Sequence, residues 1–278
     1  MPRSTDETVI TPAVLRDWPL PDPGNSKESR GTVLVVGGSK FNPGAVLLAG
    51  VAALRAGAGR LQLAVAEESA VAMSIAVPEA KVIGLPDGDE LTALASSADV
   101  IALGPGLDDI DKTTELMRTV LGAAGEDTAV VLDAYALGAL SKDANLLRQR
   151  RTVLTPNFTE AEHLLGRSPD GDDPAAVAAE LAARYRAVVS LYGHIATPDG
   201  HHWSEQSGDA GLGTSGSGDT RAGVVAGLLG RGADPAQAAC WGAYAHAVSG
   251  QRLMLRHGRT GFLARELVDE IAGTIAMI

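Results

Sequence analysis

The sequence predicts an α/β fold in which helices cover both faces of a mostly parallel central sheet. Short β-branched runs alternate along the chain with Ala- and Leu-rich stretches of helical length. The β-branched runs are uniformly apolar, as in strands that are buried on both faces. Aromatic residues make up only 4% of the chain, so the core must be built from Ala, Val, Leu and Ile. Ligands of such sheets bind at the carboxyl ends of the strands, so function is expected in the loops there.

The predicted elements alternate strand and helix, and the last part of the chain is helical. Strands are predicted at Thr32–Val36, Arg60–Ala66, Asp99–Leu103, Ala129–Leu132, Thr152–Leu154 and Ala187–Leu191. Helices are predicted at Ala45–Ala56, Lys112–Gly122, Glu160–Leu165, Pro174–Arg184, Asp219–Leu229, Pro235–Val248 and Gly261–Ile271. A Pro-Asp-Gly turn within Thr197–Trp203 predicts a short hairpin after the last of these strands.

The chain is predicted to form one domain preceded by an arm. Proline and glycine cluster before residue 31, as Pro19, Pro21, Pro23 and Gly24, which predicts an N-terminal arm over residues 1–30 that lies on the surface. No Gly- or Ser-rich linker interrupts the alternation that follows. Residues 31–278 are therefore expected to fold as a single domain.

Charge and composition exclude several classes of protein. The chain has 23 Lys and Arg against 34 Asp and Glu, a net charge of −11, which disfavours a nucleic-acid partner. Its single cysteine, Cys240, excludes an internal disulfide and a zinc site built on several thiolates. No apolar run approaches the roughly 20 residues of a membrane span, and the start MPRSTDETVI lacks the apolar segment of a secretory signal. We therefore expect a soluble, cytoplasmic protein without a membrane partner.

Several catalytic motifs are missing from the sequence. It contains no Gly-Lys dipeptide, and hence no Walker phosphate loop, and it lacks HExxH, GxSxG and CxxC. A GxGxxG at Gly211, Gly213 and Gly216 comes too late in the chain for a dinucleotide-binding βαβ unit. The histidines show no metal-ligand spacing, so no metal site of the protein is predicted; His246, on an Ala-rich helix, is expected to be packed in the core.

The loop Gly211–Gly218 is the strongest candidate for a ligand site. Its small residues Ser215, Gly216, Ser217 and Gly218 leave the backbone free to surround an anion, and a helix is predicted to start at about Asp219. The unpaired N–H groups of the first turn of a helix attract anions. Asp219 is either the N-cap of that helix or a general base toward a substrate hydroxyl, and its position alone does not decide between the two.

Other loops at strand ends offer weaker candidates. Lys40, after the first predicted strand, is expected to be a solvated charge. Asp133 at a strand end suits a metal ligand or substrate contact, or the N-cap of the next helix. Asn157 and Glu160 are polar candidates after the strand Thr152–Leu154, although Glu160 also suits the start of a helix.

Together the loops resemble one family. The ordered motifs are GGSKxxxGA, LRAGAG, GPGL, LDAxAL, LTPNxxE and GSGD followed by AGxxAGLL. They are similar to those of the ADP- or ATP-dependent NAD(P)H-hydrate dehydratases of the ribokinase-like superfamily, over nearly the whole chain from Gly31. The resemblance implies a three-layer ribokinase-like fold, Mg²⁺, and repair of hydrated NADH or NADPH with ADP or ATP as phosphoryl donor. A homo-oligomer, possibly a tetramer, is also expected.

Carried over by position, the resemblance assigns site residues. Asp219 is expected to be catalytic, and the substrate is expected to contact Ala45, Gly106, Asn157 and Asp219. The nucleotide is expected to contact Tyr192, Gly193, His194, Ile195, Ala196 and Gly218. This sequence departs from the family's motifs at four positions: TPH reads TPN at Asn157, LKG reads LYG at Tyr192, the second Asp of LDADAL is Tyr135, and the glycine that often follows GPGL is Asp108.

Three functions therefore remain open from the sequence. The first is the nucleotide-dependent dehydratase, and the second is a small-molecule kinase of the same superfamily that leaves a stable phosphoester on a vitamin- or sugar-type alcohol. The third is a diverged nucleotide-binding protein without activity, which the residues at Asn157, Tyr192 and Tyr135 motivate.

Overall fold

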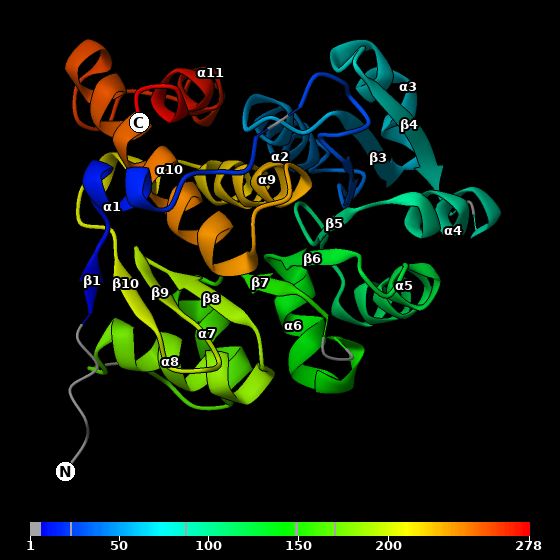
Figure 1. The fold of residues 1–278 in the computed structure, drawn as a ribbon. Coiled ribbons are helices and arrows are strands. Elements are labelled where there is room, and N and C mark those ends of the chain that lie inside the picture. The colour runs from blue at the N-terminus through cyan, green and yellow to red at the C-terminus, as the bar shows by residue number, and fades with distance from the viewer. Residues whose placement is uncertain (1–6, 23, 87, 148–149, 170) are drawn as a thin grey trace.

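A computed structural model describes residues 7–22, 24–86, 88–147, 150–169 and 171–278 of the chain (Figure 1). The strands are β1 (Thr8–Val9), β2 (Thr32–Val36), β3 (Arg60–Ala66), β4 (Ala80–Leu85), β5 (Val100–Leu103), β6 (Ala129–Leu132), β7 (Thr152–Leu154), β8 (Val188–Leu191), β9 (His194–Ala196) and β10 (His202–Ser204). The α-helices are α1 (Pro12–Asp17), α2 (Gly44–Arg55), α3 (Glu67–Ala76), α4 (Gly88–Ser97), α5 (Ile110–Ala123), α6 (Tyr135–Lys142), α7 (Phe158–Leu165), α8 (Pro174–Tyr185), α9 (Ser217–Gly230), α10 (Pro235–His257) and α11 (Ala264–Ile275).

Within the described residues the strands form one ten-stranded sheet in the order β1-β10-β9-β8-β7-β6-β5-β2-β3-β4. The central strands are parallel: β2 lies between β3 and β5, with Val33 opposite both Leu61 and Val100. Only β9 runs antiparallel to its neighbours, β8 and β10. The predicted mostly parallel sheet is thus confirmed, and the hairpin predicted within Thr197–Trp203 is the β9–β10 connection.

Each face of the sheet carries its own layer of helices. Along β2, Val33 and Val35 point into one core and Leu34 and Val36 into the other, as the alternation of a strand requires. Helices α2, α9, α10 and α11 cover the first face, and α5, α6, α7 and α8 the second (Figure 1). This is the three-layer arrangement predicted for strands that are buried on both faces.

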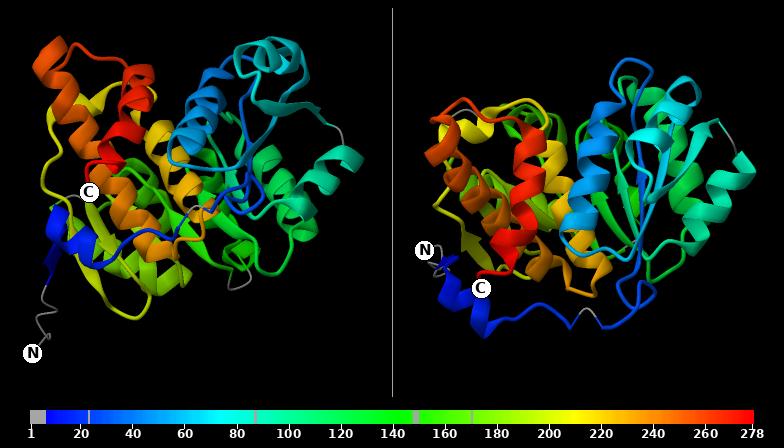
Figure 2. Two further views of the ribbon diagram at one scale, coloured as in Figure 1. Left: turned by 45° about the horizontal axis from the view of Figure 1, so that its top comes forward. Right: turned by 90° about the horizontal axis from the view of Figure 1, so that it is seen from above.

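The contact between α2 and α9 positions the site. The two helices lie side by side (Figure 2), and glycines of α9 allow their backbones to approach closely. A Cβ on Gly223 would lie 2.1 Å from the Ala49 carbonyl oxygen, and a Cβ on Gly227 would lie 2.3 Å from that of Ala53. The matched order of these contacts shows that the helices run in the same direction, so their N-termini lie at one edge of the sheet.

Several elements were not predicted from the sequence, at both edges of the sheet and within it. They are strands β1 and β4 and helices α1, α3, α4 and α6, and the predicted start of α9 is two residues late. Strand β4 is an edge strand and only Ile83 of it is buried, so its pattern of apolar residues is weak.

Among the described residues, no helix has the length and apolar character needed to cross a membrane.

The described part of the N-terminal arm belongs to the fold. Strand β1 pairs with β10 at the edge of the sheet, and Leu15 of α1 is fully buried. The Trp241 indole donates a hydrogen bond of 2.9 Å to the carbonyl of Trp18. The expectation of an arm that merely lies on the surface is therefore corrected for residues 7–22, because apolar side chains anchor it. Residues 1–6 and Pro23 lie outside the described residues, and the boundary at residue 31 stays a prediction.

Candidate functional site

Helix α9 begins at Ser217, so Asp219 is not its N-cap. The N-cap is Gly216, in the left-handed conformation at φ 86°, and no side chain caps the helix. Asp219 is the third residue of the helix, and its carboxylate makes no hydrogen bond to another described residue. The N–H groups of Gly218 and Asp219 have no acceptor one turn earlier in the helix. The capping alternative is therefore wrong. The predicted anion-binding segment Ser215–Gly218 leads into a first helical turn whose N–H groups at Gly218 and Asp219 are available to a ligand.

One flank of this turn faces the main cleft of the protein, which we define by its lining residues. It has a volume of about 800 Å³ and lies between the first turns of α9, helix α10 and the loops after β7 and β8. The lining includes Asn157, Tyr192, Gly193, Ser217, Gly218, Arg221 and His246. Asp219, Ala45 and Gly106 do not line it, so the predicted site residues divide into two groups.

The second group lies on the opposite flank of α9, toward α2. Gly223 contacts Ala49 and Gly227 contacts Ala53, so one turn earlier in both helices Asp219 comes opposite Ala45. A Cβ on Gly106 would lie 3.0 Å from the Ala45 Cβ, so the GPGL loop closes the same corner. The structure thus brings together three of the four predicted substrate residues, next to the first turn of α9.

Backbone hydrogen bonds hold the GPGL loop against the loop after β2. The Gly38 N–H donates to the Pro105 carbonyl at 2.8 Å, and the Ser39 N–H donates to that of Gly106 at 2.7 Å. Gly106 has φ 71°, and a Cβ there would lie 2.3 Å from the Asn42 carbonyl oxygen. Only glycine fits this position without strain or displacement of the backbone.

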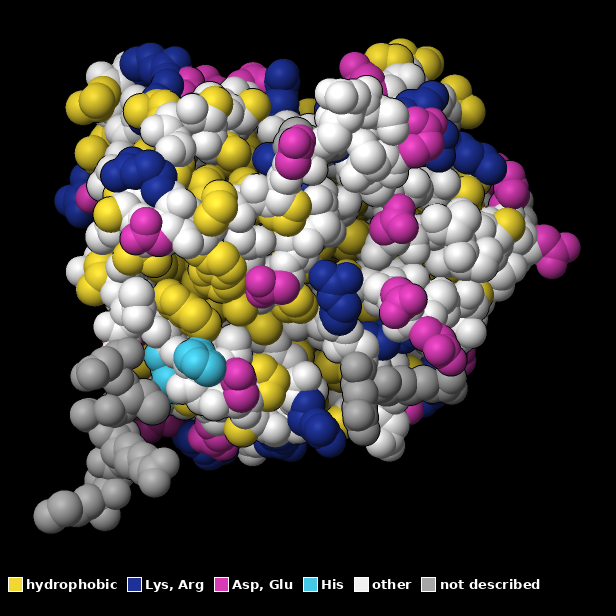
Figure 3. All heavy atoms as spheres, viewed as in Figure 1, with side chains coloured by type: hydrophobic (Ala, Val, Ile, Leu, Met, Phe, Trp, Pro, Cys, Tyr) yellow, Lys and Arg dark blue, Asp and Glu magenta, His cyan; other side chains and the backbone are white. Residues whose placement is uncertain are grey.

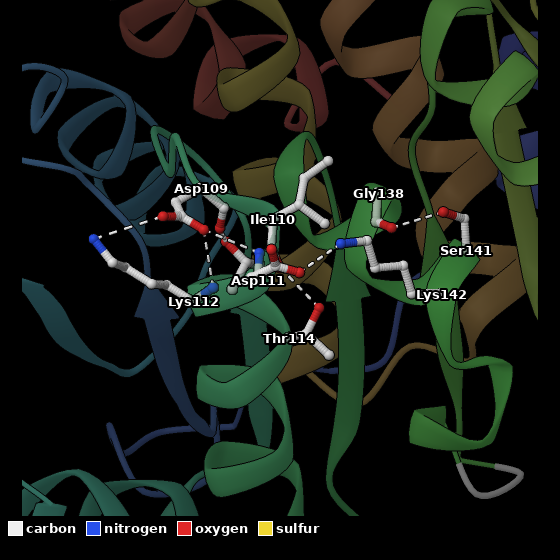
Figure 4. Close-up of polar contacts among 9 residues, drawn as sticks. Asp109, Ile110, Asp111, Lys112, Thr114, Gly138, Ser141 and Lys142 are labelled. Carbon is white, nitrogen blue, oxygen red and sulfur yellow. Dashed lines mark hydrogen bonds and ion pairs between the residues drawn. The ribbon is translucent and has the colours of Figure 1, made fainter.

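The helix after the GPGL loop is fixed to its neighbour (Figure 4). Asp109 caps α5 by accepting hydrogen bonds of 3.0 Å from the N–H groups of Asp111 and Lys112. Lys142 of α6 forms an ion pair of 2.5 Å with Asp111. The cap fixes the start of α5 after the GPGL loop, and the exposed ion pair joins α5 to α6, the helix that follows Asp133.

Three carboxylates and one guanidinium group gather where β6, β7 and α9 meet. Asp133 is buried and accepts a hydrogen bond of 2.7 Å from the Thr155 hydroxyl; it does not cap α6, whose N-cap is Ala134. Burial, followed by the charge of Asp133, raises the pKa of Asp219 to about 6. Burial, followed by the same charge, raises the pKa of Glu160 to about 7. An acid with a pKa near neutrality at a substrate corner is suited to accept and release a proton.

Asn157 and Glu160 form a capping box at the start of α7. The Glu160 N–H donates to Asn157 Oδ1, and the Asn157 N–H donates to Glu160 Oε2, each at 2.9 Å. The predicted substrate residue Asn157 therefore has a structural role as N-cap, while it also lines the main cleft. The spacing Asn-x-x-Glu is a known signature of this box, so the cap of α7 was predictable from the sequence.

The predicted nucleotide segment 192–196 divides between the cleft and the sheet. Tyr192 and Gly193 line the cleft, whereas His194, Ile195 and Ala196 form strand β9 and stay predictions. Tyr192 is 57% exposed, and its ring stacks on that of Phe158 with ring centroids 4.8 Å apart. Tyr192 also has a positive φ of 46°, which costs a non-glycine residue about 1–2 kcal/mol.

Two cleft residues were not assigned to the site by the sequence. His246 is buried, and its Nε2 lies 2.8 Å from the hydroxyl of Ser217 at the start of α9. Burial, followed by the charge of Arg221, lowers the pKa of His246 to about 3, so its ring is neutral. The expectation of a packed histidine is confirmed, and the ring also orients Ser217. The second residue, Arg221, donates to the Thr155 carbonyl at 2.8 Å.

Comparison with known proteins agrees with the motif order. A family model described as NAD(P)H-hydrate dehydratase matches residues 33–272. An ADP-dependent (S)-NAD(P)H-hydrate dehydratase of Xanthomonas campestris is 44% identical, with 96% of each chain covered. The crystal structure of an ADP/ATP-dependent NAD(P)H-hydrate dehydratase of Bacillus subtilis, co-crystallised with ATP and Mg²⁺, is similar with a TM-score of 0.88 at 30% identity, covering 99% of both chains.

A ribokinase-like superfamily protein of Enterococcus faecalis has the same fold, with a TM-score of 0.87 at 22% identity over 100% of this chain and 98% of that one. The chain therefore combines the order of loops described above with a glycine-lined contact between α2 and α9 and a free first turn of α9. This chain belongs to the NAD(P)H-hydrate dehydratase family, which are lyases with the ribokinase-like fold.

Proposed function

We propose that the protein is an ADP-dependent (S)-NAD(P)H-hydrate dehydratase. The observation that carries the proposal is the division of residues around the first turn of α9. The main cleft lies on one flank, and Asp219 lies opposite Ala45 on the other. A nucleotide in the cleft and a hydrated nicotinamide at Ala45 and Gly106 would meet across the N–H groups of that turn, which favour phosphate oxygens.

The chemistry follows from the poor leaving group of the hydrate. Asp219 accepts the proton of the ring hydroxyl while the hydroxyl oxygen attacks the terminal phosphorus of ADP. The bond between that phosphorus and the bridging oxygen breaks, and AMP is released. The phosphorylated ring then loses phosphate as the ring-nitrogen lone pair forms a C=N bond. Loss of a proton from the neighbouring ring carbon restores the dihydronicotinamide. The first turn of α9 stabilises the negative charge on the transferring group.

Mg²⁺ is also part of this proposal, and the residues present fit it. No group of three or more metal-ligating side chains occurs in the described part of the chain. Mg²⁺ needs only one or two carboxylates when substrate phosphates and water complete its shell. Glu160 and Asp133 do not line the main cleft but lie close enough to Asp219 to affect its surroundings, so they would hold a cation on the Asp219 side of the first turn of α9. When bound, the ion would neutralise charge on the transferring phosphoryl group.

The test incubates purified protein with (S)-NADH hydrate, ADP and Mg²⁺ and follows the absorbance of NADH. We expect turnover that requires the nucleotide and releases AMP and phosphate. Folded protein without turnover refutes the proposal. A stable phosphorylated product by mass spectrometry would instead identify a kinase, and calorimetric binding of ADP without turnover would identify an inactive nucleotide-binding protein.

We further propose a homo-oligomer. Hydrophobic side chains gather around α1 and α10 on one face of the molecule (Figure 3), and Trp18, Leu20, Ala236 and Tyr244 are only partly buried there. Such a surface favours association with a second copy. Light scattering coupled to gel filtration tests this proposal, and a monomer at micromolar concentration refutes it.

A further inference from the structure

Arg221 has a special place among the cations of the main cleft. Only two described residues that line the cleft are cationic, Arg221 and Arg259. Arg259 is exposed, and its Nε donates to Asp209 at 2.6 Å, so its charge is already paired. Arg221 forms no ion pair of this kind within the described residues. Among the described lining residues it is therefore the cation without a direct ion pair, although Asp133 and Glu160 lie nearby, in a protein with net charge −11.

The hydrogen-bonding capacity of Arg221 is only partly used. One of its terminal nitrogens donates to the Thr155 carbonyl at 2.8 Å. Its Nε is buried and has no hydrogen-bond partner. A guanidinium group has five N–H donors, and leaving buried donors unpaired costs free energy. Burial lowers the pKa of Arg221, and nearby Asp133 and Glu160 partly offset this effect, so the cleft lining holds a guanidinium group with donors that no described residue accepts from.

The position of Arg221 on α9 directs it to the phosphate cradle. Ser217 and Arg221 are four residues apart, so they occupy the same face of the helix, and both line the cleft together with Gly218. Asp219 is two residues from Arg221 and occupies the flank toward α2. Tyr192, which stands where the family's motif has lysine, is close enough to Arg221 to affect its charge.

We propose that Arg221 binds the phosphates of the nucleotide and supplies from α9 the positive charge that is missing at Tyr192. This inference rests on the proposed function for the identity of the ligand. Its planar fork is suited to two oxygens of one phosphate, whereas the helix N–H groups bind the neighbouring oxygens. Arg221 is then a specificity-determining residue that favours nucleotides with more phosphate.

The experiment measures calorimetric affinities of adenosine, AMP and ADP for the wild type, Arg221→Met and Arg221→Lys. Loss of a charge-assisted contact worth about 1.5–3 kcal/mol corresponds to a loss of about tenfold to a hundredfold. We expect Arg221→Met to lose this much ADP affinity and to change adenosine affinity less than about twofold. Arg221→Lys, which keeps the charge but not the fork, should retain an intermediate ADP affinity.

Two further variants separate a binding role from a structural one. Arg151→Met is the matched control, because Arg151 also donates to a backbone carbonyl, that of Ala233, but does not line the cleft. It should bind all three ligands like the wild type. The double variant Tyr192→Lys with Arg221→Met returns a cation to the cleft and should recover part of the ADP affinity without changing adenosine affinity.

The outcomes distinguish the inference from the proposed function. Equal losses for adenosine and ADP, or an unchanged ADP affinity in Arg221→Met, overturn the inference. If Arg221→Met does not fold, an ADP affinity of Arg221→Lys equal to that of the wild type overturns it. A wild type that binds ADP but does not dehydrate NADH hydrate refutes the function and leaves the inference standing. A wild type that does not bind ADP overturns both.

Discussion

Replacing Asp219 with asparagine should remove activity and, at neutral pH, make the protein more stable. The wild-type carboxylate lies in the first turn of α9, where burial and the charge of Asp133 raise its pKa from 3.8 to about 6. A change of this size corresponds to about 3 kcal/mol by which the ionised form is disfavoured in the folded protein. Asparagine has nearly the same shape but never ionises.

The sign follows from proton binding. Because the folded protein holds this proton more tightly than the unfolded chain, the stabilisation is complete below pH 3.8 and is lost as pH rises through about 6. The Asp219→Asn variant has no carboxyl group at this position to ionise, so it does not lose this stability as pH rises. At about pH 8 the variant should therefore have a free energy of unfolding up to about 3 kcal/mol above that of the wild type. The difference should vanish below about pH 4.

Urea unfolding of both proteins between about pH 4 and pH 8 measures this difference, provided that the denaturant slope is unchanged. Dehydration of NADH hydrate is measured on the same preparations and should be lost. A variant less stable than the wild type at about pH 8, by the roughly 1 kcal/mol typical of a lost helix cap, would refute the reasoning about burial. Retained turnover would refute the role of Asp219 as base.

Three other predictions follow from the same geometry. Gly223→Ala should destabilise the protein by about 1–3 kcal/mol or more in urea unfolding, because its Cβ would meet the Ala49 carbonyl; the control Gly122→Ala, with open space around its Cβ, should be neutral or stabilising. Asp109→Ala should cost about 1 kcal/mol through the lost cap of α5, whereas Lys142→Met, which breaks only an exposed ion pair, should cost less than about 1 kcal/mol; equal losses would contradict this ranking. Activity should fall as pH decreases through about 7 and then about 6, as Glu160 and Asp219 gain protons; a flat profile in kcat would contradict their involvement.

The sequence was sufficient for the central sheet because β2, β3, β5, β6 and β7 are short apolar runs with clear breaks between them. It was insufficient for β4, where only Ile83 is buried and the alternation is therefore faint. At the site, the motifs placed Asp219 at the free turn of α9, but they could not decide whether it caps the helix. That question depends on where the helix starts, and the left-handed Gly216 moves the start to Ser217.

Contacts between residues that are distant in the sequence were harder to predict. His246 and Ser217 are 29 positions apart, and only the packing of α10 against α9 brings them within 2.8 Å. Arg221 did leave a signal, since it follows Ser217 by one helical turn and so shares its face. The Asn157–Glu160 spacing was also visible in the sequence, but it predicts a capping box as well as a ligand site.

The glycines of α9 explain why this helix can serve two ligands at once. Gly223 and Gly227 let α9 approach α2 until backbone contacts backbone, which fixes the rotation of α9 about its own axis. With that rotation fixed, the 100° advance per residue sends Asp219 toward Ala45 and sends Ser217 and Arg221 toward the main cleft. A larger residue at position 223 should therefore do more than loosen the core: by rotating or displacing the first turn, it should lower turnover of whatever protein remains folded. Asp219 and Arg221 are two residues apart in the sequence. They can face Ala45 and the main cleft, respectively, only while the contact between α9 and α2 holds.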